Sequence, residues 1–424
     1  CMVNYWALDS NSTLIVEEIP YLKSVAIGIY IKVGSRHEFE HMAGASHFIE
    51  HMLFKGTATR SAKEIAESFE GIGGQLNAFT AKEYTCLYAR TLDENCYEAI
   101  DILFDMIFNS AFKDKDFATE KGVVIEEINM YEDLPDDLIH DVFAEKLWEG
   151  NSMGVPILGT VDSVKGFARD DIFEFYKNSY TPDNLIISVA GNVKNGIVKD
   201  KIEKILNKQP STRVQINKSA ASTNSSFINL IEKEMEQVQL CIGGPSISYF
   251  DNNRYTQNVL NSILGGGLSS RLFQKMREEL GLAYSVYSHP ATYSDTGSYG
   301  IYIGTSRGNI SRFFAALYEE LHLFLSEGVT EKEVERTQKL IKSSLYLGME
   351  SATNRMSRLG RTMLMYGKII PVEEIIDKVL VVTSQDVNEL AHSMLNHNSL
   401  SLAAIGAPEV LPKVEEEFVK HFKK

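Results

Sequence analysis

The chain has 424 residues, of which 44% are hydrophobic and 23% are charged, the balance of a folded globular protein rather than a disordered or fibrous one. Its 57 acidic residues outnumber its 42 basic residues, and the net charge of −15 argues against a nucleic-acid-binding protein. A negative surface is compatible with the attraction of basic peptides, although such surfaces commonly serve solubility alone. The chain is too long for one hydrophobic core, so two domains are expected.

The apolar segments are too short to cross a bilayer, and the most apolar one, residues 25–33, is interrupted by Lys32. We therefore expect no membrane span. The first residues contain no basic segment followed by an apolar one, so neither a secretory signal nor a transit peptide is expected. The cysteines are scattered without a Cys-x-x-Cys pair, which predicts free thiols and a cytoplasmic location. They are Cys1, Cys86, Cys96 and Cys241.

The first half of the chain alternates between strand-like and helix-like patterns. Apolar, β-branched segments predict strands at residues 13–19, 24–33 and 184–190. A glycine cluster at 71–74 precedes a predicted hairpin of residues 75–80 and 84–90. Helical spacing predicts four helices, of which the last is broken near Pro135. These helices are expected at residues 44–54, 62–69, 94–110 and 114–148.

A polar segment, residues 211–226, predicts a linker, because few of its side chains could join a core. After it the order of elements starts again, with strands, a helix, a glycine-containing loop, a hairpin and long helices. The predicted elements include residues 227–232, 237–243, 254–264, 283–288, 297–303 and 400–405. We therefore predict an α+β fold with two similar domains, residues 1–210 and 227–424, each with an antiparallel-rich sheet packed with helices on one face.

A His-x-x-Glu-His pattern within the first predicted helix indicates a metal site. His47 and His51 are four residues apart, so their imidazoles lie one above the other on a helix and can reach the same ion. Glu50 lies beside them and provides a carboxylate near the metal. Three protein ligands, an open position for water and a nearby base are what zinc hydrolysis requires. Two surface histidines on an amphipathic helix are the plainer interpretation of this pattern alone.

The wider pattern resembles the inverzincin peptidases, the family that includes pitrilysin, insulin-degrading enzyme and the mitochondrial processing peptidases. In that family a glutamate on a separate long helix, about 76 residues beyond the second histidine, is the third zinc ligand, and Glu127 has this spacing from His51. The resemblance also covers Glu120, whose counterpart supports the zinc site without binding the metal. Seven residues make nearly two helical turns, so Glu120 and Glu127 share a face, whereas Glu126 is expected to face solvent.

The segment 73–80 resembles the strand on which family members hold an extended peptide by pairing with its backbone. The resemblance implies substrate-binding roles for Asn77 and Ala78, and for Phe79 and Thr80 that follow them. Taken alone, the segment is an ordinary hairpin strand.

In the second half, Arg277 and Tyr284 match an Arg and a Tyr that the family carries seven residues apart, with Gly281 between them. The resemblance implies that both donate hydrogen bonds to the substrate carbonyl and its oxyanion. A surface arginine and a strand tyrosine are the alternative.

Residues 265–267 are three consecutive glycines, a pattern that could suggest a phosphate-binding loop. Because no Lys-Ser/Thr follows them at P-loop spacing, we reject phosphate binding. A flexible loop near the substrate or a helix-terminating turn both fit this segment.

These observations predict a zinc metalloendopeptidase with one Zn²⁺ per chain, held by His47, His51 and Glu127. Glu50 is the expected general base, while Arg277 and Tyr284 stabilise the oxyanion. Like the short, bacterial-type family members, the chain carries both the zinc motif and the Arg/Tyr pair. We therefore expect a homodimer with a closed chamber that takes extended peptides. The alternative is a non-catalytic family subunit with a peptide-binding or assembly role.

Overall fold

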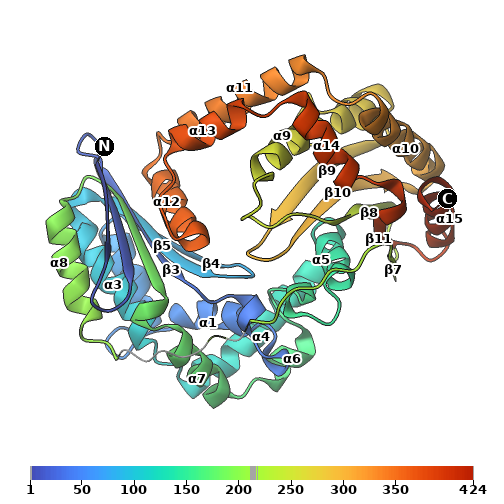
Figure 1. Cartoon of the computed structure of the whole chain (residues 1–424). Helices are drawn as coiled ribbons and strands as arrows, with labels where there is room; N and C mark the ends of the chain where they lie inside the picture. The colour runs from blue at the N-terminus through green and yellow to red at the C-terminus, as the bar shows by residue number, and fades with distance from the viewer. Residues whose placement is uncertain (1, 211–215, 217, 424) are drawn as a thin grey trace. The chain divides into compact units, whose positions relative to one another are not determined.

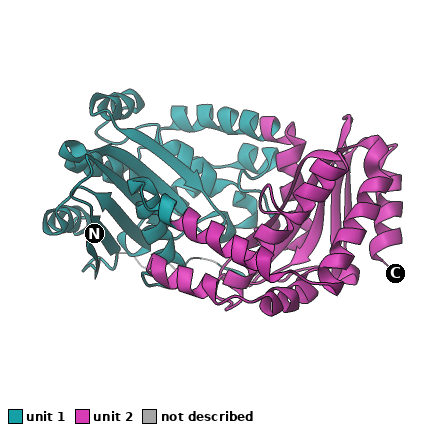
Figure 2. Ribbon diagram, turned by 90° about the horizontal axis from the view of Figure 1, so that it is seen from above, with its two compact units in different colours: residues 1–129, 155–219, 346–370 teal, residues 130–154, 220–345, 371–424 magenta. Residues whose placement is uncertain are grey.

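The computed structural model describes residues 2–210, 216 and 218–423, and it divides into two compact units (Figures 1 and 2). Unit 1 comprises Cys1–Asn129, Val155–Ser219 and Tyr346–Ile370, and unit 2 comprises Met130–Gly154, Ala220–Leu345 and Pro371–Lys424. Among the described residues, no helix is both long and apolar enough to cross a membrane.

Unit 1 is built on a six-stranded sheet in the order β1-β2-β6-β3-β5-β4. β2 and β6 run parallel, and the other neighbours run antiparallel. The sheet is therefore antiparallel-rich, as predicted. Its strands are β1 (Met2–Ala7), β2 (Thr13–Glu18), β3 (Ser24–Ile31), β4 (Gln75–Thr80), β5 (Thr85–Leu92) and β6 (Leu185–Gly191).

The helices of unit 1 cover both faces of this sheet. Their bounds are α1 (Ala45–Leu53), α2 (Ala62–Gly71), α3 (Cys96–Asn109), α4 (Asp114–Glu132), α6 (Val161–Gly166), α7 (Arg169–Ser179), α8 (Asn195–Leu206) and α12 (Ala352–Tyr366). Short 3₁₀ turns lie at Ser35–His37, Glu40–Met42, Asp93–Asn95 and Pro182–Asn184.

Strand β3 explains why helices are needed on both faces. Successive strand residues point to opposite faces, and β3 is buried along nearly its whole length. One face joins the main core with α1 and α3, whereas the other, including Tyr30, packs against α12. At this second contact α12 lies so close to the sheet that position 360 has no room for a side chain. A Cβ on Gly360 would lie 2.3 Å from the Tyr30 ring. Ser188 adds a hydrogen bond of 2.8 Å from its Oγ to the carbonyl of Met356.

Unit 2 repeats the same plan with a five-stranded sheet in the order β7-β11-β8-β10-β9. β7 and β11 run parallel, and the others run antiparallel. This order corresponds strand by strand to β2-β6-β3-β5-β4 of unit 1, so the predicted α+β class with two similar domains is confirmed. The strands are β7 (Ile228–Glu232), β8 (Gln237–Pro245), β9 (Ala283–Thr292), β10 (Gly297–Ser306) and β11 (Ser401–Gly406).

The helices of unit 2 also cover both faces of its sheet. α5 (Pro135–Leu147) packs on one face, while the long α10 (Ile310–Ser326) belongs to the core on the other. The remaining helices are α9 (Arg254–Leu264), the π-helix η6 (Phe273–Glu279), α11 (Glu331–Gly348), α13 (Val372–Leu380), α14 (Ser384–Met394) and α15 (Leu411–Phe422). Three 3₁₀ turns lie at Ser152–Gly154, Arg307–Asn309 and His397–Ser399.

The compact units differ from the predicted contiguous division into residues 1–210 and 227–424. Each sheet has a second apolar face, and the helix that covers it comes from the other half of the sequence: α12 in unit 1 and α5 in unit 2. The prediction had assigned helices to one face only. Residues 211–215 and 217 of the predicted linker 211–226 lie outside the described residues, and the boundary at Ser219 falls within that segment.

Candidate metal centre

The histidine helix α1 lies with one face in the core of unit 1. Phe48, Ile49, Met52 and Leu53 are fully buried, so the helix is anchored along its apolar side. His47, Glu50 and His51 occupy another face, with the i, i+3, i+4 spacing that places their side chains together. The packing that forms the helix therefore also fixes the direction of the polar groups.

The second contributor is α4, the long helix at Asp114–Glu132. Val124 and Ile128 anchor it in the core, while Glu120 and Glu127 face α1. Glu120 is 2% exposed, whereas the Glu127 side chain is 44% exposed. Glu126 is exposed to solvent, as predicted.

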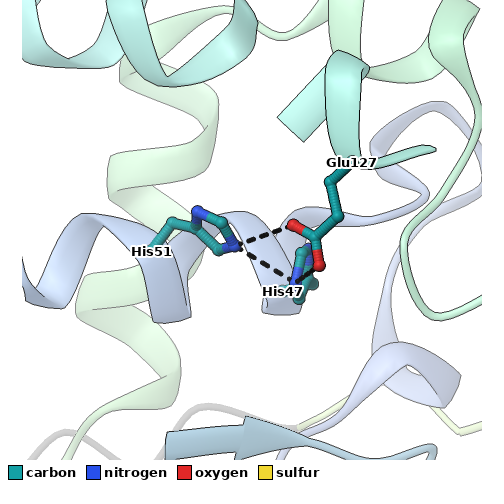
Figure 3. Close-up of side chains that lie close together, drawn as sticks. All are labelled: His47, His51 and Glu127. Carbon is teal, nitrogen blue, oxygen red and sulfur yellow. Dashed lines mark hydrogen bonds and ion pairs between the residues drawn. The ribbon is translucent and has the colours of Figure 1, made fainter. Parts of the chain in front are cut away.

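The three predicted ligands converge (Figure 3). His51 Nε2 lies 3.2 Å from His47 Nε2 and 3.2 Å from Glu127 Oε2, and His47 Nε2 lies 3.6 Å from Glu127 Oε1. Among the described residues, these three are the one group of His, Cys, Asp or Glu whose ligand atoms lie close enough together to share an ion.

This geometry fits a zinc ion. Tetrahedral ligands with bonds of about 2.1 Å lie roughly 3.4 Å from one another, close to the separations of the three ligand atoms. Burial, reinforced by the neighbouring His51, lowers the pKa of His47 to about 3. The imidazole is therefore neutral at physiological pH and keeps a lone pair for a metal.

Glu120 and Lys55 form a chain of hydrogen bonds behind His51. Glu120 Oε1 lies 2.8 Å from His51 Nδ1, and Glu120 Oε2 lies 2.8 Å from Lys55 Nζ. Burial opposes ionisation of Glu120, but its hydrogen bonds with His51 and Lys55 outweigh this and lower its pKa. The carboxylate therefore accepts the Nδ1 proton of His51 and leaves Nε2 to face the metal position.

The electrostatics of His51 follow from these neighbours. Burial lowers the pKa of His51, but the hydrogen bond to Glu120 and the charge of Glu127 outweigh burial and raise the pKa above its ordinary value. His51 therefore holds a proton more readily than His47 when no metal is bound. A metal ion would replace that proton at Nε2.

Glu50 is held by Thr80, the last residue of strand β4. Thr80 Oγ1 donates a hydrogen bond of 2.6 Å to Glu50 Oε2. Burial raises the pKa of Glu50, while the Thr80 hydrogen bond opposes that rise. A carboxylate with a raised pKa accepts and releases a proton more easily near neutral pH, which is what a general base needs.

Strand β4, where the predicted substrate-binding residues lie, is the edge of its sheet. Its backbone pairs with β5 on one side, so the groups on the other side are available to an extended peptide. Asn77 Oδ1 accepts a hydrogen bond of 2.8 Å from the backbone N–H of Ala78, and Phe79 packs against the rings of Tyr84 and Tyr88.

Arg277 and Tyr284 belong to unit 2, whereas the metal group belongs to unit 1. Arg277 lies in the π-helix η6, and Tyr284 lies at the start of β9. The Arg277 guanidinium stacks on the Tyr284 ring at 4.5 Å and on the Phe273 ring at 4.9 Å. Tyr284 is 81% exposed, so the structure brings the pair together on an accessible surface.

Two contacts of the site were not predicted from the sequence. Lys55 lies just beyond α1, which ends at Leu53, and no local pattern indicates its contact with the Glu120 carboxylate. The hydrogen bond from Thr80 to Glu50 joins residues thirty positions apart in sequence, so no local pattern indicates it.

One class of zinc peptidases is defined by a repeated α+β unit. In this class, one helix carries two histidines and a glutamate, and a neighbouring helix carries a second glutamate. Comparison with known proteins agrees. Residues 13–161 match the family model described as insulinase (peptidase family M16), and residues 166–341 match the model described as peptidase M16 inactive domain. The chain belongs to the insulinase family, peptidase family M16.

Relatives span nearly the whole chain. An uncharacterized zinc protease of Bacillus subtilis, YmxG, is 41% identical over 97% of this chain and 100% of its own length. An uncharacterized zinc protease of Streptomyces coelicolor is 37% identical over 94% of this chain and 88% of its own.

Two solved structures share the fold. A peptidase M16 inactive domain from Pseudomonas fluorescens has a TM-score of 0.88 and 19% identity, covering 96% of this chain and 98% of that one. A protease from Helicobacter pylori has a TM-score of 0.89 and 18% identity, covering 95% and 99%.

Proposed function

We propose that this protein is a zinc-dependent endopeptidase with one Zn²⁺ per chain. The observation that carries the proposal is the convergence of His47, His51 and Glu127, with Glu50 on the same face of α1. When bound there, zinc would act as a Lewis acid that polarises a peptide carbonyl and makes water a better nucleophile.

The side chains of the site would perform the remaining steps. Glu50, oriented by Thr80, takes a proton from the attacking water and delivers it to the leaving amine. The edge of β4 pairs with the substrate backbone, which holds the peptide extended with little dependence on its side chains.

Arg277 and Tyr284 would complete the reaction by donating hydrogen bonds to the oxyanion. We further propose that two copies of the chain form a homodimer that encloses extended, preferentially basic peptides in a chamber. In such a homodimer, each Arg277 and Tyr284 pair would act at the partner's zinc.

The first test compares the wild type with Glu50→Gln by zinc content and cleavage of a quenched-fluorescence peptide library. We expect Glu50→Gln to retain zinc and to lose at least about a hundredfold in activity, the contribution of a general base. Removal of zinc by a chelator should abolish wild-type cleavage, and added zinc should restore it. Cleavage that survives chelation would contradict a zinc peptidase, and zinc binding without any cleavage would favour the non-catalytic alternative.

A further inference from the structure

A buried carboxylate lies at the start of the histidine helix. Glu38 is 7% exposed, and its two oxygens accept hydrogen bonds from backbone N–H groups: Gly44 N at 2.8 Å and Ser46 N at 2.7 Å. The first N–H groups of a helix have no partner within the helix, and a negative charge is favoured there. Burial raises the pKa of Glu38 to about 8, and the bonds from these N–H groups oppose the rise.

The N-cap residue of the helix itself provides no side-chain cap. Its N-cap residue is Gly44, which has a φ of +92° and no side chain to accept a hydrogen bond. A larger residue does not fit, because a Cβ on Gly44 would lie 2.5 Å from the carbonyl oxygen of Leu158. The cap therefore has to come from elsewhere in the chain, and Glu38 supplies it.

Residues of a later segment of the chain also contact the loop that precedes the helix. Ser163 Oγ donates a hydrogen bond of 2.7 Å to the carbonyl of Ala43, and a Cβ on Gly159 would lie 2.3 Å from that oxygen. The chain thus enters α1 along a fixed path. Glu38 binds this path at its last turn into the helix, through the N–H groups of Gly44 and Ser46.

The two histidines depend on this first turn to different degrees. His51 has Glu120 on its Nδ1, a contact that orients the ring independently of the helix start. His47 follows Ser46 directly, and its buried Nδ1 has no hydrogen-bond partner among the described residues. Metal-binding histidines are usually oriented by a hydrogen bond on the second ring nitrogen. Because the His47 ring has no such hydrogen bond among the described residues, it takes its direction from the backbone of the first turn.

We propose that Glu38 is a positioning residue for metal binding: by capping the first turn of α1 it holds His47 at the place where its Nε2 meets His51 and Glu127. The inference rests on the proposed function only in that this group binds zinc. It assigns Glu38 no contact with metal or substrate.

The test is the zinc affinity of the full-length chain carrying Glu38→Gln, measured by competition with a chromophoric chelator at a pH above the pKa of Glu38. An amide can accept only through its oxygen and turns an NH₂ group toward the second N–H. We expect zinc binding to weaken by about tenfold or more, the effect of losing a group that orients a ligand. With Co²⁺ in place of zinc, the visible absorption should also change, because the His47 ligand is displaced.

Glu17→Gln is the matched control. Glu17 is another buried carboxylate of unit 1, 4% exposed and paired with Arg355, on β2 rather than at the histidine helix. The Glu17→Gln substitution should lower the unfolding temperature of the protein without changing its affinity for zinc. Glu38→Asp keeps the charge on a shorter side chain and should show a smaller loss of affinity than Glu38→Gln.

The outcomes separate this inference from the proposed function. If the wild type binds zinc, His47→Ala abolishes the binding and both Glu38 variants bind zinc as tightly as Glu17→Gln does, the positioning role is wrong while the zinc site stands. If the wild type itself fails to bind zinc, the proposed function fails. A selective loss of affinity in the Glu38 variants, with folding matched to Glu17→Gln, supports the positioning role.

Discussion

His47 and His51 carry the same chemistry in different surroundings. His51 is held on Nδ1 by Glu120, and Glu120 is held in turn by Lys55, so two side chains define the orientation of this imidazole. His47 is more deeply buried, and its pKa is lowered to about 3, mainly by that burial. The site therefore combines one ring oriented by hydrogen bonds with one oriented by its helix.

Lys55 can be tested through this chain of contacts. Lys55→Met keeps the length of the side chain but removes the ammonium group from Glu120 Oε2. We expect zinc affinity to fall by about 10- to 100-fold, because residues that orient a metal ligand have effects of this size. The measurement is chelator competition, with Lys63→Met as control, since Lys63 is an exposed lysine of α2 paired with Glu67. Equal affinities for the two variants would contradict the role of Lys55.

Thr80 provides a second prediction at this scale. Thr80→Val keeps the shape of the side chain but removes the hydroxyl that donates to Glu50. Loss of one hydrogen bond to a charged group should lower kcat by roughly tenfold, because the base is less well oriented. Zinc content should stay at the wild-type level. A change in zinc affinity without a change in kcat would argue that Thr80 serves the metal group rather than the base.

At the scale of elements, helices that lie far from the sheets in sequence complete both units. α12 covers the second face of the unit 1 sheet, and α5 covers that of unit 2.

In unit 2, a bidentate ion pair joins α11 to the segment that leads into the π-helix η6. Arg271 Nε and Nη2 donate to the two carboxylate oxygens of Glu333 at 2.8 and 2.9 Å. Such forked pairs fix geometry as well as adding energy.

This ion pair gives a pH prediction. Burial opposes ionisation of Glu333, but its hydrogen bonds with Arg271 and Thr330 outweigh it and lower its pKa to about 2, from an ordinary value of 4.5. Because the folded-state pKa is depressed, the contribution to stability is complete above about pH 4.5 and is lost as the pH falls toward 2. We expect the loss to be about 2 kcal/mol, the size of a hydrogen bond to a charged group.

The pH dependence of this ion pair can be measured by urea unfolding of the wild type and of Glu333→Gln at several pH values. The difference in the free energy of unfolding between the two should be present at neutral pH and should shrink as the pH falls through this window. Glu335→Gln, on the exposed side of the same helix, is the control and should follow the wild type at every pH. A difference that stays constant with pH would contradict the assignment.

At the scale of the whole molecule, one plan is used twice, but among the described residues only the copy in unit 1 carries a group of side chains that could hold a metal ion. The strand orders of the two sheets correspond, and α9 occupies the place in the order of elements that α1 has in unit 1. α9 contains neither histidine nor glutamate. The second copy instead carries Arg277 and Tyr284, so the proposed chemistry is divided between the two copies.

Together with the proposed homodimer, this division predicts complementation between subunits. A subunit carrying His51→Ala lacks the metal site, and one carrying Arg277→Ala lacks the oxyanion donor. If Arg277 acts at the partner's zinc, a mixed dimer of the two contains one complete site and should regain part of the peptide cleavage that each variant alone has lost. A verified mixed dimer that stays inactive would show that the donor and the zinc belong to the same chain.

The sequence by itself determined the repeated α+β plan and the histidine helix, because local periodicity and the spacing of His47 and His51 on a helix can be read along the chain. Glu127 was indicated by the resemblance to the inverzincin peptidases, since helix geometry does not relate residues on two separate helices. β1 was not predicted, because its residues are mostly exposed and form no buried run. The contribution of α12 to unit 1 was not predicted either, since its apolar stripe does not specify which sheet it covers.

Only the tertiary structure decided how the site is supported. The bonds of Glu38 to the start of α1, of Lys55 to Glu120 and of Thr80 to Glu50 join groups on different elements. A charged or hydroxyl side chain is compatible with a solvated surface as well as with a buried contact, so its residue type does not name a partner. The partner is fixed when two elements pack, because a buried polar group must then find a hydrogen bond within reach.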